Sequence, residues 1–192
     1  MKLILASSSP YRRELLARLQ LPFETDSADV DESPLAGETP GALARRLAAL
    51  KADTVHARHP QAIVIGADQV GTLDGRTPIG KPGTPGRAAE QLRAASGRPM
   101  VFHTAMALRA PGHAGIDDCV DVRVVFRTLD ERSIRHYLAR EAALDCAGSA
   151  RCEGLGISLL EAIQSDDPTA LIGLPLIRLA AHLRQLGLDP LG

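Results

Sequence analysis

The sequence of 192 residues contains no tryptophan, and only 3% of its residues are aromatic. Proteins that bind single-stranded nucleic acid without sequence preference stack the bases on aromatic side chains, so we do not expect this class of binder. The net charge of −1 also argues against nucleic acid as a partner, because such surfaces carry a clear basic excess. Any anion-binding site must therefore be local.

Cysteine is scarce and long apolar runs are missing. Cys119, Cys146 and Cys152 are odd in number and form no CxxC pair, which predicts reduced thiols rather than a disulfide framework or a zinc site. No apolar run approaches the ~20 residues of a membrane-spanning helix, and the apolar N-terminal stretch is too short for a signal peptide. We expect a cytoplasmic protein with no membrane partner, folded as a single domain over residues 1–192 or as two small lobes.

Strand-like and helix-like segments alternate along the chain. Helices are predicted from Pro10, over residues 40–57, 87–95 and 130–140, and from Pro175 to Gly187. Strands are predicted over residues 2–6, 61–70, 99–110, 117–129 and 157–163. A short loop joins the two long central strands, which favours an antiparallel pair. The pattern predicts an α/β fold with a mixed sheet.

The segment LASSSPYRRELL places hydroxyl groups and cations where a strand ends and a helix begins. Ser9 suits the N-cap and Pro10 the first helical position. A helix N-terminus attracts anions, and a bound anion would explain two arginines in the first turn. The segment alone fits equally a capped helix with solvated arginines. The candidate phosphate-binding residues are Ser7, Ser8, Arg12 and Arg13.

Two charged residues occupy positions that should be buried. Lys51 continues the apolar column of Leu43 and Leu47 at helical spacing. A buried lysine needs an anionic partner, although a lysine at the stripe's edge can also extend into water. Asp68 ends an apolar strand, where α/β proteins place their chemistry; the alternative is an aspartate that forms a turn. Gln69 should face away from Asp68.

Three further residues become informative only as parts of a set. Lys81, in Gly-Lys-Pro, alone indicates an exposed loop, and Glu32 in its acidic loop alone fits a solvated charge. Glu153 precedes glycines that let the backbone approach a ligand, or it belongs to a flexible surface loop. Together the cations can neutralise a polyphosphate, while Glu32 and Asp68 can hold Mg²⁺ or activate water. This combination of cations and carboxylates is the one that hydrolysis of a phosphoanhydride requires.

Five motifs occur in order over essentially the whole chain: LASSSPYRRELL, VDES…ETP…LAALKA, IGADQV, IGKP and GLPLIRL. This set resembles the Maf family of nucleoside triphosphate pyrophosphatases. The resemblance implies an elongated mixed α/β fold like that of inosine triphosphatases, with a cleft between two lobes. It also implies hydrolysis of a nucleoside triphosphate to the monophosphate and pyrophosphate with a divalent cation (Mg, Mn or Co), and it allows a homodimer.

The same resemblance implies roles by position. Asp68 resembles the family's proton acceptor and Glu32 a metal or water ligand, so these two carboxylates form the predicted metal site. The phosphate-binding cations implied by the resemblance are Arg13, Lys51 and Lys81.

Tyr11 departs from most of the family, which has arginine at that place. With Gln69 and Glu153 it resembles the 7-methyl-GTP pyrophosphatase branch. N7-methylated guanine carries a positive charge, which favours an aromatic face and a nearby carboxylate. A dTTP/UTP pyrophosphatase of the same family is the alternative. A non-catalytic, nucleotide-sensing regulator of cell division or septation is an alternative of another class.

Overall fold

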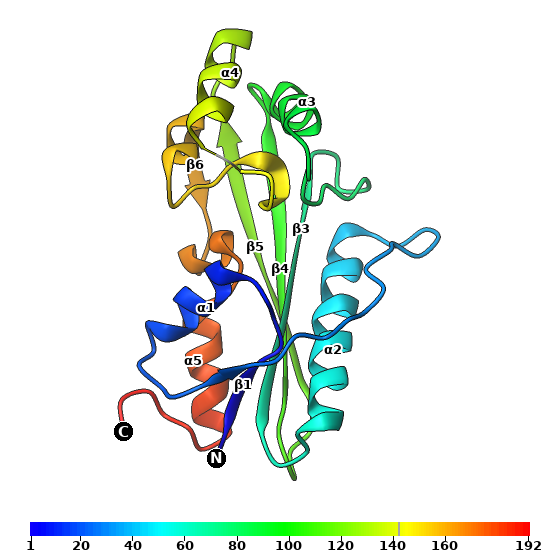
Figure 1. Cartoon of the computed structure of the whole chain (residues 1–192), viewed down its shortest axis with the longest axis vertical. Helices are drawn as coiled ribbons and strands as arrows, with labels where there is room; N and C mark the ends of the chain where they lie inside the picture. Colours follow the sequence, from blue (N-terminus) through cyan, green and yellow to red (C-terminus); the bar gives the residue numbers. More distant parts are fainter. Residues whose placement is uncertain (142) are drawn as a thin grey trace.

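A single mixed β-sheet runs along the length of the molecule, with helices packed against both faces (Figure 1). The computed structural model describes residues 1–141 and 143–192. The strand order is β2-β1-β3-β4-β5-β6. The strands are β1 (Leu3–Leu5), β2 (Glu24–Thr25), β3 (Ile63–Thr72), β4 (Pro99–Arg109), β5 (Ile116–Phe126) and β6 (Leu160–Gln164). β1 pairs in parallel with β2 and β3, and the remaining neighbours are antiparallel, which confirms the predicted mixed sheet.

The helices divide between the two ends of this sheet. They are α1 (Pro10–Ala17), α2 (Pro40–Arg58), α3 (Pro85–Ala95), α4 (Glu131–Arg140) and α5 (Leu176–Gln185), with short 3₁₀ helices η1 (Ala147–Ser149), η2 (Leu155–Leu159) and η3 (Pro168–Ile172). In Figure 1, α1 and α5 lie on one side of the lower half and α2 on the other, while α3 and α4 lie at the far end from the termini. The side chains of Ser9, Thr39 and Asp130 cap α1, α2 and α4, as local sequence predicts.

Separate apolar clusters fill the two halves. The lower cluster joins α1, α5, β1 and β3 and includes Leu5, Leu15 and Leu179. The upper cluster joins α3, α4, β4 and β5 and includes Leu92 and Phe126. The long strands β4 and β5 contribute to both halves, so the sheet is continuous while the helices on it form two groups. The residues between these groups line the cleft described below.

The helix α2 lies unusually close to β3 at Gly66. A Cβ atom built on Gly66 would overlap the carbonyl oxygen of Ala48 and would lie 2.6 Å from the amide nitrogen of Ala52. Only glycine permits this approach, because the contacting atoms belong to the backbone of α2. The close packing sets α2 against the face of β3 that carries Asp68, because Gly66 and Asp68 are two residues apart in the strand and share that face. Within the described ranges, no helix is both long and apolar enough to cross a membrane.

Candidate active site

Lys51 and two carboxylates form the centre of the cleft. Lys51 on α2 and Asp68 on β3 are each only 8% exposed. The Nζ atom of Lys51 lies 2.6 Å from Oδ1 of Asp68 and 2.5 Å from Oε1 of Glu32. Partial burial raises the pKa of Glu32, but the hydrogen bond and charge of Lys51 outweigh this effect and the pKa is lowered. The structure therefore gives the buried lysine two anionic partners.

An ion pair that we did not predict from the sequence holds the Glu32 loop against α2. Arg46 donates to both carboxylate oxygens of Glu38, at 2.7 and 2.9 Å, and also to the carbonyl of Ser33 at 3.0 Å. The backbone N–H of Leu35 donates to the same carboxylate. The hydrogen bonds from Arg46 lower the pKa of Glu38 to about 2. Several hydrogen bonds thus hold the loop segment that follows Glu32 in position.

Two neighbouring arginines in α1 face different surroundings. Arg12 donates from Nε to the carbonyl of Gly173 at 3.0 Å and from Nη1 to Oγ of Ser7 at 3.4 Å. Burial lowers the pKa of Arg12, and the charges of Asp68 and Glu32 oppose that shift. Arg13 is exposed and lines a separate hollow beside β2. The structure therefore brings Arg12 into the cleft and leaves Arg13 outside it.

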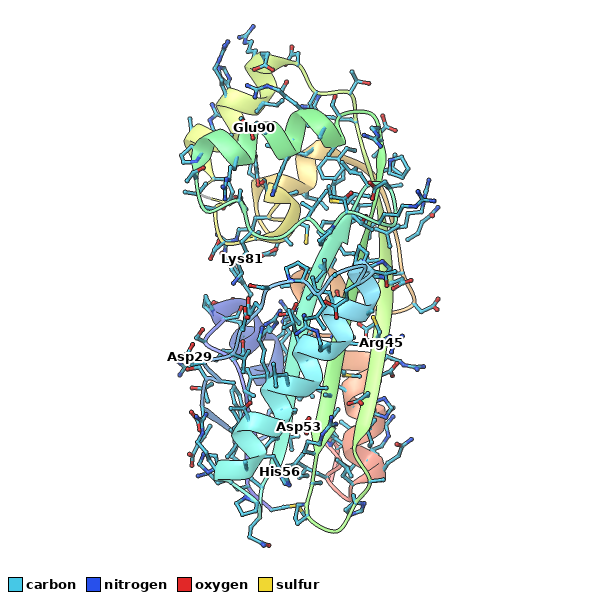
Figure 2. All side chains as sticks on the ribbon, turned by 90° about the vertical axis from the view of Figure 1, so that its right-hand side faces the viewer. Asp29, Arg45, Asp53, His56, Lys81 and Glu90 are labelled. Atoms are coloured by element: carbon cyan, nitrogen blue, oxygen red, sulfur yellow. The ribbon has the colours of Figure 1, made fainter. Side chains whose placement is uncertain are left out.

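Lys81 reaches the same cleft from the loop that follows β3. Figure 2 shows it between the upper and lower halves of the molecule, well separated from Glu90 on α3. Lys81, Arg12, Glu32 and Lys51 line a hollow of about 280 Å³. Ser7 and Ser8 border it, and Asp68 borders the adjoining hollow. Three cations thus converge on one polar cavity, which suits a polyphosphate.

A second pocket continues from this cavity beneath Tyr11. Tyr11, Arg12, Gln69, Lys81, Asp145 and Glu153 all line it. The hydroxyl of Tyr11 donates to Oδ1 of Asp145 at 3.2 Å. Burial, with the charge of Asp145, raises the pKa of Tyr11, so its hydroxyl stays protonated. The lining of the pocket therefore includes the ring of Tyr11 and the carboxylates of Asp145 and Glu153.

Gln69 faces away from Asp68, as strand alternation predicts. Its Nε2 atom donates to the backbone carbonyls of Ala170 at 2.9 Å and Leu171 at 3.0 Å. Two carbonyls require a donor, so the amide orientation follows from chemistry. Within the described part of the chain, no hydrogen bond reaches Oε1 of Gln69. The residue can therefore present an acceptor to a ligand in the pocket.

The carboxylates fit a metal ion that arrives with its substrate. Among the described residues, no group of three or more His, Cys, Asp or Glu side chains is arranged to hold a metal. Glu32 and Asp68 both line the hollow that adjoins the phosphate cavity, and Lys51 forms an ion pair with each of them. Mg²⁺ commonly uses one or two protein carboxylates together with substrate phosphates and water. The donor set matches that pattern rather than a permanent protein cage.

Comparison with known proteins gives consistent matches over almost the whole chain. Residues 2–186 match the family model described as Maf-like protein. A Bordetella pertussis (strain Tohama I) protein named 7-methyl-GTP pyrophosphatase is 57% identical over 190 residues, which cover 99% of this chain and 94% of that protein. A Pseudomonas aeruginosa (strain PAO1) protein with the same name is 54% identical over 188 residues, 97% of each chain.

Among solved structures, the crystal structure of a nucleoside-triphosphatase / dITP/XTP pyrophosphatase from Mycobacterium abscessus is similar in fold. It aligns with a TM-score of 0.50 and 15% identity over 97% of this chain and 95% of its own. At that identity the likeness concerns the fold alone, and it agrees with the predicted inosine-triphosphatase-like architecture.

Proposed function

The chain belongs to the Maf-like family, and from that premise we propose that it hydrolyses 7-methyl-GTP to 7-methyl-GMP and pyrophosphate. The observation that carries this proposal is the buried Lys51 between Glu32 and Asp68, in a cavity that Arg12 and Lys81 also line. The relatives at 54–57% identity, named 7-methyl-GTP pyrophosphatases, support the same reaction. We further propose that residues 1–192 act as one domain in the cytoplasm.

In the proposed reaction, Asp68 accepts a proton from the attacking water. The water oxygen forms a bond to the α-phosphorus, and the bond from that phosphorus to the α,β-bridging oxygen breaks, so that pyrophosphate leaves. Lys51, 2.6 Å from Asp68, holds the carboxylate in position for this transfer. Because Lys51 is buried, its charge acts in a medium that screens it weakly.

Cations around the cavity stabilise the negative charge of the phosphates. Lys81 and Arg12 both line it, and cations in such positions stabilise charge on the transferring group and the leaving group. Ser7 and Ser8 offer hydroxyl donors at the same wall. We assign the arginine role to Arg12 rather than to Arg13, because Arg13 lies outside the cleft.

Glu32 and Asp68 would hold a divalent cation together with the phosphate oxygens. Such an ion, when bound, supplies charge neutralisation at the phosphates. Lys51 and the two carboxylates lie in one small site. When the phosphates enter, the ammonium of Lys51 can therefore pass a hydrogen bond from a carboxylate to a phosphate oxygen, and no buried charge is left without a partner.

The pocket beneath Tyr11 would determine which nucleotide base binds. N7-methylated guanine is cationic, and an aromatic face and a carboxylate both favour a cation. Tyr11 supplies the ring and Glu153 the carboxylate. The carboxylate of Glu153 and the Oε1 of Gln69 are acceptors, which match the donor N1–H and amino groups on the guanine edge.

A substrate panel tests the proposal. The ratio kcat/KM is measured for 7-methyl-GTP, GTP, dTTP, UTP and CTP with Mg²⁺, Mn²⁺ or Co²⁺, with released pyrophosphate converted to phosphate by a coupling enzyme. A clear preference for 7-methyl-GTP is expected. Preference for dTTP or UTP would retain the chemistry and reject the base assignment. Nucleotide binding without turnover would instead support the regulator.

A further inference from the structure

Arg151 stacks over the ring of Tyr11, a residue that lines the second pocket. Its Cζ atom lies 5.2 Å from the centre of the Tyr11 ring. Its Nε lies 3.3 Å from Oε1 of Glu153, and its Nη1 lies 3.1 Å from Oε1 of Glu141. Arg151 is a planar cation, and a guanidinium stacks on aromatic rings as well as pairing with carboxylates. It therefore makes the two interactions expected of a 7-methylguanine base.

We propose that Arg151 occupies the base site of the free protein as an internal stand-in for the cationic base, so that an incoming base must displace it. This inference rests on the proposed function, because it takes Tyr11 and Glu153 as the groups that receive the base. Arg151 then affects specificity by competition, because its guanidinium and the methylated base bind the same ring, that of Tyr11, and the same carboxylate, that of Glu153.

Glu141 gives Arg151 a place to remain after displacement. The Glu141 side chain is only 14% exposed, and its Oε2 accepts from the backbone N–H of Leu155 at 2.8 Å. A Cβ built on Gly154 would overlap the same oxygen, so the loop closes tightly over this carboxylate. Glu141 is thus fixed in position, and Arg151 can keep this ion pair while it releases Tyr11 and Glu153.

The charges determine the sign of the expected effect. Displacing Arg151 opposes the binding of any base, and its displaced charge, still near Glu141, repels a cationic base further. Replacing Arg151 with an uncharged side chain removes both penalties. Binding should therefore become tighter for 7-methyl-GMP and, to a smaller degree, for GMP.

Calorimetric titration with 7-methyl-GMP and GMP tests this directly, with thermal melting as the check of folding. Arg151→Met should lower the Kd for 7-methyl-GMP roughly three- to tenfold, as expected for one exposed cation–π contact and a partly screened charge. Arg151→Lys, which keeps the charge, should fall between wild type and Arg151→Met. Arg123→Gln is the matched control, because Arg123 is exposed on β5 and bonds Gln164 instead. Unchanged or weaker binding by Arg151→Met would overturn the inference.

A second measurement uses the wild-type chain and does not depend on how a variant folds. The NMR signal of the Arg151 Nε–H should be shifted upfield by the Tyr11 ring, and it should move downfield when 7-methyl-GMP saturates the site. Arg151→Lys identifies the signal. A signal that stays in place on saturation would overturn the inference. Failure of wild type to hydrolyse 7-methyl-GTP would reject the proposed function itself, which separates the two claims.

Discussion

The ammonium nitrogen of Lys51 lies 2.6 Å from Oδ1 of Asp68, with both side chains almost completely buried. The two residues come from different elements, α2 and β3, and meet because Gly66 lets the helix approach the strand. Glu32 completes the arrangement from a loop. The chemistry assigned to the cleft depends on this contact, since it fixes the carboxylate that accepts the proton.

Lys51→Met should reduce kcat/KM for 7-methyl-GTP by roughly 10²–10³, the loss typical of removing one charged stabilising group from an active site. It should also destabilise the fold by up to ~3–5 kcal/mol, because Asp68 keeps its buried charge without a partner. Steady-state kinetics and urea unfolding measure the two effects. Lys51→Arg is the control that keeps the charge, and it should recover part of the stability. Near-normal turnover by Lys51→Met would reject the role given to Lys51.

Gly66→Ala should destabilise the protein by about 1–3 kcal/mol, the usual penalty for overpacking, and should lower activity by shifting α2 and Lys51. The new methyl group would meet backbone atoms of Ala48 and Ala52, which have no rotamer to change. Gly86→Ala in α3 is the matched control, since nothing lies within 4 Å of the position that its methyl group would take. Urea unfolding of both variants measures the difference. Equal stability of the two variants would show that the close approach is not limiting.

Glu38→Gln should lower kcat/KM roughly two- to fivefold, because it weakens the fastening of the loop that carries Glu32. The folded pKa of Glu38, about 2, lies below its ordinary 4.5. A lowered pKa contributes stability above pH 4.5, and this contribution disappears as the pH falls from 4.5 towards 2. The stability difference between wild type and Glu38→Gln should follow that course in chemical unfolding.

Glu90→Gln provides the comparison for this series, because Glu90 is an exposed acid on α3, distant from the loop (Figure 2). It should leave both the activity and the pH course unchanged. A stability difference between wild type and Glu38→Gln that is independent of pH from 2 to 6 would contradict the assignment of the ion pair.

The three thiols should react slowly with alkylating reagents. Burial raises the pKa of Cys119 to about 11 and those of Cys146 and Cys152 to about 12, the latter two also beside carboxylates. The thiolate is the reactive form, so at pH 8 each thiol should be alkylated by iodoacetamide roughly 100-fold or more slowly than an ordinary free cysteine. Mass spectrometry of timed samples measures the rates. Rapid alkylation of Cys146 would contradict the protonated, buried environment.

Local chemistry predicts much of the fold. Ser9 caps α1 as the sequence predicts, and the helices predicted near residues 40 and 130 begin after the caps Thr39 and Asp130, because capping depends on residues adjacent in sequence. The last strand is predicted less accurately. The sequence pattern favours residues 157–163, but β6 begins at Leu160, since residues 155–159 form a 3₁₀ helix instead. The contact of Gly66 with α2 joins distant elements, so no local pattern predicts it.

The site can be predicted from the sequence where a charged residue occupies a position that should be buried. Lys51 on an apolar column indicates a buried cation in need of an anion, but the sequence does not identify both partners. Successive residues of a helix point about 100° apart, so only the packed fold decides which of Arg12 and Arg13 faces the cleft. Arg151 gives no signal, because its stacking on Tyr11 joins residues 140 positions apart through tertiary structure.

The most direct test of the account is turnover of 7-methyl-GTP in ¹⁸O-labelled water, followed by mass spectrometry of both products, with Asp68→Asn beside the wild type. The account predicts one ¹⁸O atom in 7-methyl-GMP and none in pyrophosphate, with turnover lost in Asp68→Asn while its melting transition is retained. Label in pyrophosphate, release of single phosphate groups, or near-normal turnover by Asp68→Asn would contradict attack at the α-phosphorus by water that Asp68 activates.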